Sequence, residues 1–119
     1  MPNFSGFGGH LNWNEFSWNI KDWNIVFNRP PFSSANWSGT LILSKSVWMQ
    51  IMAEMKDPMD MTKVKDPTEK AIEGEFQNKG KTYSGLLYLE STPNAIADNP
   101  RIHFVVAAGS ELKENGIPL

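Results

Sequence analysis

Residues 11–28 alternate between apolar and polar side chains, and the alternation changes phase twice. The apolar positions are odd, then even, then odd again: Leu11 and Trp13; Phe16, Trp18 and Ile20; Trp23, Ile25 and Phe27. A period of two is typical of a strand with one buried face. Each change of phase adds one residue, as a β-bulge at 14–15 and a bulge or tight turn at 21–22 would do, and such irregularities bend a strand. The segment therefore predicts one long coiled strand or two paired strands.

Further strands are predicted downstream. Apolar and alternating segments place them at 37–43, 71–77, 82–90 and 101–108. Residues 78–81 join the middle two strands as a hairpin, because Asn78 and Gly80 supply the left-handed conformations of a short turn. The last strand is so apolar that we expect it at the centre of the sheet.

A single short helix interrupts these strands. Apolar residues recur at helical spacing over 46–56, with Ser44 or Ser46 as the N-cap and Pro58 ending the helix. The apolar stripe consists of Val47, Trp48, Ile51, Met52 and Met55. The polar segment that follows, 56–70, is expected to be a long mobile loop.

This order of elements predicts a mainly β fold. A small barrel of five to six strands, with one short helix between the third and fourth, has the element order of the OB fold, which binds single-stranded nucleic acid or oligosaccharide. A β-sandwich or jelly-roll fragment is the alternative. The 119 residues suit one domain, expected at 10–108, with a flexible glycine-rich arm at 1–9 and a C-terminal tail at 109–119 holding at most one helical turn.

Composition excludes several classes of function. The chain has no cysteine, so disulfides and thiolate metal sites are excluded, and its net charge of -2 provides no overall attraction for nucleic acid or an anionic membrane. No apolar run approaches the roughly 20 residues that span a bilayer, and residues 1–10 lack the features of a signal peptide. We therefore expect a cytoplasmic protein without membrane partners, in which any anion binding is local.

Residues suited to catalysis or metal binding are few. His10 and His103 lie far apart and outside the spacings that metals use, so no metal site or cofactor is expected. Glu73 and Glu75 share a strand face, which fits a solvated surface better than an acid–base pair. The Gly-Lys-Thr sequence at 80–82 lacks the earlier glycine and following helix of a phosphate-binding loop. The protein is therefore expected not to be an enzyme.

Tryptophan and asparagine are concentrated in the first third of the chain. Trp13, Trp18, Trp23 and Trp37 each adjoin an asparagine. Indole faces stack on bases or sugar rings, and asparagine supplies paired donors and acceptors. Trp13 and Trp18 share a face with apolar neighbours and are expected in the core. For Trp23 and Trp37, at strand starts, core and surface positions are equally open.

Lysines complete the predicted binding surface. In the OB order of elements, the long loop and the hairpin tip flank the binding face, and both carry lysines. Carboxylates are interleaved with these lysines, which favours a mixed solvated surface over a binding surface. The predicted nucleic-acid-binding residues are Trp23, Trp37, Lys63, Lys65, Lys79, Lys81 and Tyr83.

The sequence thus predicts a non-enzymatic, homo-oligomeric protein that binds single-stranded nucleic acid by aromatic stacking and lysine contacts. An alternative is a structural, self-assembling subunit of a virion or scaffold, in which the aromatic surface is an interface between copies. A third is a carbohydrate-binding module, which would use the aromatic residues but none of the lysines.

Overall fold

The computed structural model describes residues 3–27, 37–55, 60, 62, 66–90, 98–107 and 110–118. More than half of these residues lie in strands, and the described strands form one antiparallel sheet accompanied by one α-helix and a short 3-10 helix. The mainly β class with one short helix is therefore confirmed. Among the described residues, no helix has the length and apolar character needed to cross a membrane.

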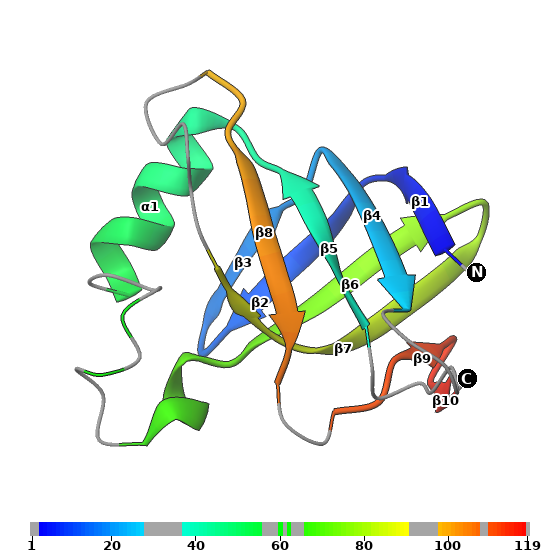
Figure 1. Cartoon of the computed structure of the whole chain (residues 1–119). Helices are drawn as coiled ribbons and strands as arrows, with labels where there is room; N and C mark the ends of the chain where they lie inside the picture. The colour runs from blue at the N-terminus through cyan, green and yellow to red at the C-terminus, as the bar shows by residue number, and fades with distance from the viewer. Residues whose placement is uncertain are drawn as a thin grey trace.

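The sheet curls into a half-barrel (Figure 1). Its strands run in the order β1-β4-β5-β8-β7-β6-β2-β3, and β9 joins β7 and carries β10. The elements are β1 (Asn3–Phe7), β2 (Gly9–Trp13), β3 (Phe16–Asn19), β4 (Asp22–Phe27), β5 (Trp37–Ile42), α1 (Lys45–Met55), η2 (Pro67–Lys70), β6 (Ile72–Asn78), β7 (Lys81–Leu89), β8 (Arg101–Val106), β9 (Lys113–Glu114) and β10 (Ile117–Pro118).

The first change of phase in residues 11–28 is a hairpin turn. Strands β2 and β3 pair with Trp13 opposite Phe16, so Asn14 and Glu15 form a two-residue connection. Asn14 has a φ of 53°, a left-handed conformation that such tight turns use. Two paired strands, one of the two sequence alternatives, are thereby confirmed. The bulge predicted here is wrong, because the register contains no extra residue.

The second change of phase is a bend shared by both arms of this hairpin. The ladder continues through the bend: the Gly8 N–H donates to Lys21 O at 3.0 Å, and the Ile20 N–H donates to Gly9 O at 3.0 Å. Gly8 and Gly9 have φ values of 85° and 127°, which other residues rarely adopt. The bend lets both Ile20 and Trp23 point into the core, although they are not two residues apart.

The bent hairpin explains why the sheet curls. One arm, β1 and β2, borders β6 through its second half, and the other arm, β3 and β4, borders β5 through its second half. The first and last strands of the sheet order are therefore parts of the same hairpin. The five to six strands expected become ten described segments, since each arm is divided at the bend and a C-terminal hairpin adds two.

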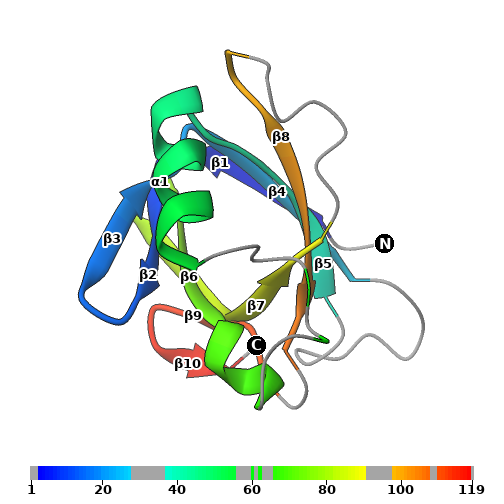
Figure 2. The same ribbon diagram turned by 90° about the vertical axis from the view of Figure 1, so that its left-hand side faces the viewer.

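Helix α1 confirms the prediction made from residues 46–56. The Ser44 Oγ accepts a hydrogen bond from the Val47 N–H at 3.2 Å, so Ser44 is the N-cap. Trp48, Ile51 and Met55 are buried in the main core. Figure 2 shows α1 in front of the curled sheet, next to β3.

Two terminal segments differ from their predictions. The expectation of an irregular N-terminal arm is wrong for residues 3–7, which form β1 and pair with β4, because a ladder of backbone hydrogen bonds does not depend on side chains. The one helical turn that the sequence allowed in the tail is absent from the described residues 110–118, where β9 and β10 form a hairpin. Its turn residues, Asn115 and Gly116, have φ values of 52° and 85°, as a two-residue hairpin turn requires.

The hairpin and the apolar strand predicted downstream are confirmed. Strands β6 and β7 pair around Lys79 and Gly80, whose φ values are 50° and 83°. The left-handed conformation predicted for Asn78 is wrong, because Asn78 is the last residue of β6 and pairs with Lys81. Strand β8 lies between β5 and β7 in the sheet. Of the predicted loop 56–70, the described part contains η2, where the buried Lys70 donates from Nζ to Asp60 O at 2.7 Å. The rest of that prediction concerns residues outside the described ranges.

Candidate functional site

A groove of about 810 Å³ lies beside the tip of the β6–β7 hairpin, on the outer side of β1, β4, β5 and β8. Strands β4 and β5 turn Trp23, Ile25 and Leu41 into the core. Because side chains alternate along a strand, the intervening residues point outward. The side chains that bear on function here are Phe7, Asp22, Asn24, Thr40, Lys79 and Arg101.

One row of side chains crosses all four strands of the groove. Phe7 lies opposite Asp22, Asp22 opposite Ile42, and Ile42 opposite Arg101. Directly opposed residues on one face have Cβ atoms about 5 Å apart. The row therefore places an aromatic ring, a carboxylate, an aliphatic side chain and a guanidinium side by side. Phe7 is 81% exposed.

A second row lies next to the first and holds Ser5, Asn24, Thr40 and His103. Asn24 accepts a hydrogen bond at Oδ1 from the Thr40 N–H at 3.2 Å, so its Nδ2 donors remain for another partner. Strands β4 and β5 approach closely here: a Cβ on Gly39 would lie 1.9 Å from the Asn24 carbonyl oxygen. Glycine is therefore required at this point of β5, where a side chain would also meet the core ring of Phe104.

The groove carries cations at two sides. Lys79 is exposed at the hairpin tip, and Arg101 is exposed at the start of β8. Within the described part of the chain, neither has a carboxylate partner within ion-pair distance. Lys21, adjacent in sequence to Asp22, is exposed and donates from Nζ to Asn99 Oδ1 at 2.8 Å. Among the described residues that line the groove, Asp22 is the one carboxylate, and Lys79 and Arg101 are the cations.

The outer side of β6 and β7 has the opposite character. Two shallow hollows of about 450 and 420 Å³ are lined there by Glu73, Glu75 and Glu111, together with Lys113. The Asn12 Nδ2 donates to Oε1 of both Glu73 and Glu75, at 3.3 and 2.5 Å. This side of the sheet is acidic, and two of its carboxylates are engaged with Asn12.

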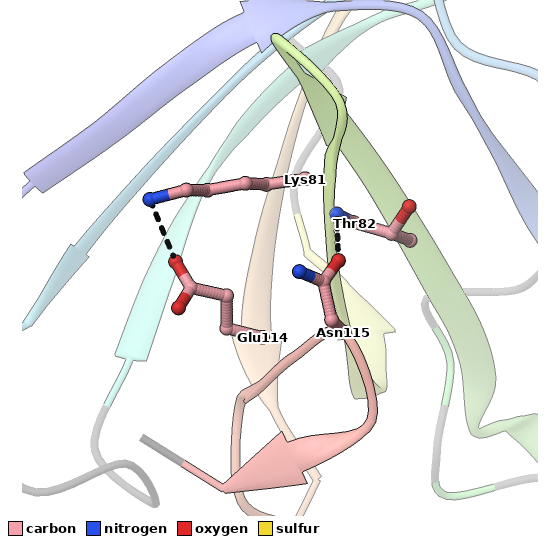
Figure 3. A network of polar contacts seen from close by, with 4 residues as sticks. All are labelled: Lys81, Thr82, Glu114 and Asn115. Carbon is pink, nitrogen blue, oxygen red and sulfur yellow. Dashed lines mark hydrogen bonds and ion pairs between the residues drawn. The ribbon is translucent and has the colours of Figure 1, made fainter.

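Lys81, the other lysine of the tip, lies opposite Asn78 and two residues before the buried Tyr83, so it does not share the face of Glu73 and Glu75. Its Nζ lies 3.5 Å from Glu114 Oε1, and next to this pair the Thr82 N–H donates to Asn115 Oδ1 at 3.0 Å (Figure 3). These contacts attach the C-terminal hairpin to β7. Lys79, two residues earlier, lies in the groove. The two lysines of the tip therefore have different surroundings.

Trp23 and Trp37, for which the sequence left core and surface open, are both buried, so their predicted role in binding is wrong. Their exposed fractions are 3% and 0%. The Trp23 indole N–H donates to Gln77 O at 3.1 Å, and that of Trp37 donates to Ser110 O at 3.2 Å. Each ring is inward on its strand and its polar atom is satisfied within the protein. Neither ring face is open to a base.

Tyr83 is also buried, contrary to its predicted role in binding. Its ring stacks on Phe4 at 4.7 Å between centroids and meets Trp23 edge-on at 5.9 Å. Burial raises the pKa of its hydroxyl, and the hydrogen bond and negative charge of Glu114 raise that pKa further. Tyr83 therefore links the core to the C-terminal hairpin.

Of the five predicted site residues that the structure describes, Lys79 alone has an exposed side chain in the groove. Lys63 and Lys65 lie outside the described residues. Sequence reasoning missed Phe7 and Arg101. The outward position of Arg101 follows from its alternation with the buried Ile102, whereas Phe7 had no signal once its segment was taken as an irregular arm.

Other sites find no support in the described ranges. No three His, Asp or Glu side chains there come together in a way that could hold a metal ion. No protein-family model matches the chain, and no curated protein or solved structure matches it either. Function is therefore inferred from the groove itself.

Proposed function

We propose that this protein binds single-stranded nucleic acid in the groove on β1, β4, β5 and β8, without catalysing a reaction. One observation supports this most: the exposed ring of Phe7 and the exposed guanidinium of Arg101 stand in one row across the groove, and Lys79 lies at the hairpin tip beside it. An aromatic platform flanked by cations is how proteins take single strands without sequence preference.

The arrangement of elements agrees with an OB-like build. If each arm of the bent hairpin counts as one strand, α1 follows the third strand, and the β6–β7 tip borders the outer face of the second and third strands. In the OB fold, that face and that tip bind oligonucleotides. Strand β8 is additional to the five strands of that fold, since it lies between β5 and β7.

The binding energy would come from stacking and from release of counterions. Stacking of one base on an aromatic side chain contributes about 1 to 3 kcal/mol. Contacts from Lys79 and Arg101 to two phosphates would give a slope of log K against log salt of about -1.4 on a single strand. The acidic side formed by β6 and β7 repels phosphate, so we expect the strand to bind on the groove side alone.

The test is fluorescence anisotropy with a labelled thymidine oligonucleotide between about 50 and 200 mM salt. We expect binding that weakens roughly sevenfold over this range, from the slope above. Arg101→Ala should reduce the slope by about 0.7. Lys113→Ala, which removes an exposed cation from the acidic side, is the matched control and should leave the slope unchanged. Absence of binding, or equal effects of the two variants, would refute the proposal.

The same preparation separates the alternative functions. Sedimentation that shows a large closed oligomer with no affinity for the oligonucleotide would favour the self-assembling subunit. Retention on immobilised glycans that is lost in Phe7→Ala and kept in Arg101→Ala would favour a carbohydrate-binding module, because sugar stacking needs the ring and not the cation.

A further inference from the structure

A carboxylate lies inside the groove proposed for a polyanion. Asp22 is half-buried on the outer side of β4, between Phe7 on one neighbouring strand and Ile42 on the other. A carboxylate there repels phosphate and opposes binding unless it accepts hydrogen bonds from the ligand. Its position in the floor of the groove therefore points to a base rather than to the backbone of the strand.

The register sets what Asp22 can meet. Phe7 and Asp22 are directly opposed and face the same side, so their Cβ atoms lie about 5 Å apart. A base stacked on the Phe7 ring extends past it, and its edge then lies above Asp22. Asn24 follows Asp22 on the same face of β4, because residues two apart share a face.

The two side chains present a defined set of acceptors and donors. An ionised carboxylate offers acceptors alone. Asn24 already accepts from the Thr40 N–H at Oδ1, so toward the groove it offers the donors on Nδ2. The floor beside Phe7 thus presents two acceptor oxygens followed by an amide donor.

Guanine matches this set better than the other bases. Its Watson–Crick edge carries two adjacent donors, N1–H and N2–H, which a carboxylate binds as a bidentate pair, followed by the acceptor O6. Adenine and cytosine each offer an amino group beside an acceptor. Thymine and uracil place N3–H between two acceptors, one of which faces the carboxylate.

We propose that Asp22 selects guanine at the nucleotide stacked on Phe7, with Asn24 donating to O6. This inference rests on the proposed function, since it assigns a base preference to the same groove. Asp22 would lower the affinity of the groove for pyrimidine strands and raise it for strands that carry a guanine.

The test compares thymidine oligonucleotides that differ at one central base: guanine, inosine or thymine. Inosine keeps N1–H and O6 but lacks the N2 amino group, so it isolates the bidentate pair. In the wild-type protein we expect guanine to bind roughly 5- to 150-fold more tightly than thymine, with inosine between them. This ranking needs no variant and overturns the inference if the three bind equally.

Asp22→Asn sharpens the test, because it removes the charge and one acceptor while keeping the side-chain shape. We expect this variant to bind the guanine and inosine oligonucleotides equally and to bind all-thymine strands more tightly than the wild type. Glu111→Gln, an exposed carboxylate on the acidic side, is the control and should preserve the guanine preference.

The outcomes keep the two proposals apart. Salt-sensitive binding of the thymidine strand without any guanine preference would refute the role of Asp22 and leave single-strand binding standing. A preference for guanine over inosine that survives in Asp22→Asn, with near-ultraviolet circular dichroism unchanged, would also refute that role. Failure to bind any of the three would refute both.

Discussion

The two outer sides of the curled sheet are built from similar antiparallel strands but differ in how their charged side chains are used. On the groove side, Lys79 and Arg101 are exposed without a described carboxylate partner, next to the exposed Phe7. On the β6–β7 side, Asn12 bonds two glutamates, and the exposed Lys113 lies in one hollow with Glu73 and Glu111. A cation that lies among carboxylates attracts a polyanion less than a cation that lies among neutral side chains, so the neighbouring charges distinguish the two sides better than the presence of a cation does.

The contrast between a buried and an exposed aromatic residue gives the largest expected effect. Trp23→Ala should destabilise the protein by about 3 to 5 kcal/mol, because it empties part of the core beneath the groove. Phe7→Ala should change the free energy of unfolding by no more than about 0.5 kcal/mol, yet weaken binding of a single strand by about 1 to 3 kcal/mol. Urea unfolding and anisotropy titration measure the two quantities.

Ile117→Ala is the control for Phe7, since this apolar side chain is 71% exposed on the C-terminal hairpin. It should change neither stability nor affinity. A Phe7→Ala variant that behaves like Ile117→Ala would remove the aromatic platform from the groove.

Lys79 and Lys81 offer a smaller and sharper comparison. Lys79→Ala should reduce the slope of log K against log salt by about 0.7 and leave stability unchanged. Lys81→Ala should leave the salt dependence unchanged and lower stability by about 0 to 1 kcal/mol, because it breaks an exposed pair with Glu114. Anisotropy and urea titrations of the two variants are the measurement, and identical results for the two would contradict the assignment of Lys79 alone to the groove.

The smallest expected effect is a loss of stability at alkaline pH, caused by Tyr83 where it meets the C-terminal hairpin. Burial and Glu114 raise the pKa of Tyr83 above its ordinary value of 10.0. The unfolded chain therefore releases this proton first, and the stability that protonated Tyr83 contributes is present below pH 10 and falls as the pH rises from there through the folded pKa. Tyr83→Phe should lose this part of the alkaline decline in melting temperature. Tyr88→Phe is the control and should retain it.

Local signals in the sequence were sufficient for α1 and for the β6–β7 hairpin. The Ser44 cap and the apolar stripe of α1 act within single helical turns, and the turn at Lys79 and Gly80 depends on two backbone conformations. The same kind of signal was present and missed at Asn115 and Gly116, where an Asn-Gly pair marks a two-residue hairpin turn.

The alternation of apolar residues over 11–28 predicted the strands correctly but not how they are connected. The phase changes of residues 11–28 indicated bends in paired strands, but the first one is a turn and the second is a bend that needs Gly8 and Gly9 on the opposite arm. Glycines in residues 1–9 were taken as a mark of irregular structure. Gly8 and Gly9 instead form the bend of one arm, opposite the bend of the other arm. This arrangement follows from the pairing of β1 with β4.

By itself, the sequence determined a mainly β protein with one capped helix, the tight turn at the β6–β7 tip, and a charge balance that restricts anion binding to a local site. Tertiary structure alone decided that Trp23 and Trp37 face inward, that Lys81 meets Glu114, and that Phe7, Asp22 and Arg101 form one row. Helical turns and hairpin connections depend on residues a few positions apart. The groove depends on cross-strand register between segments distant in sequence, and shifting any strand by one residue would turn its groove side chains to the other face.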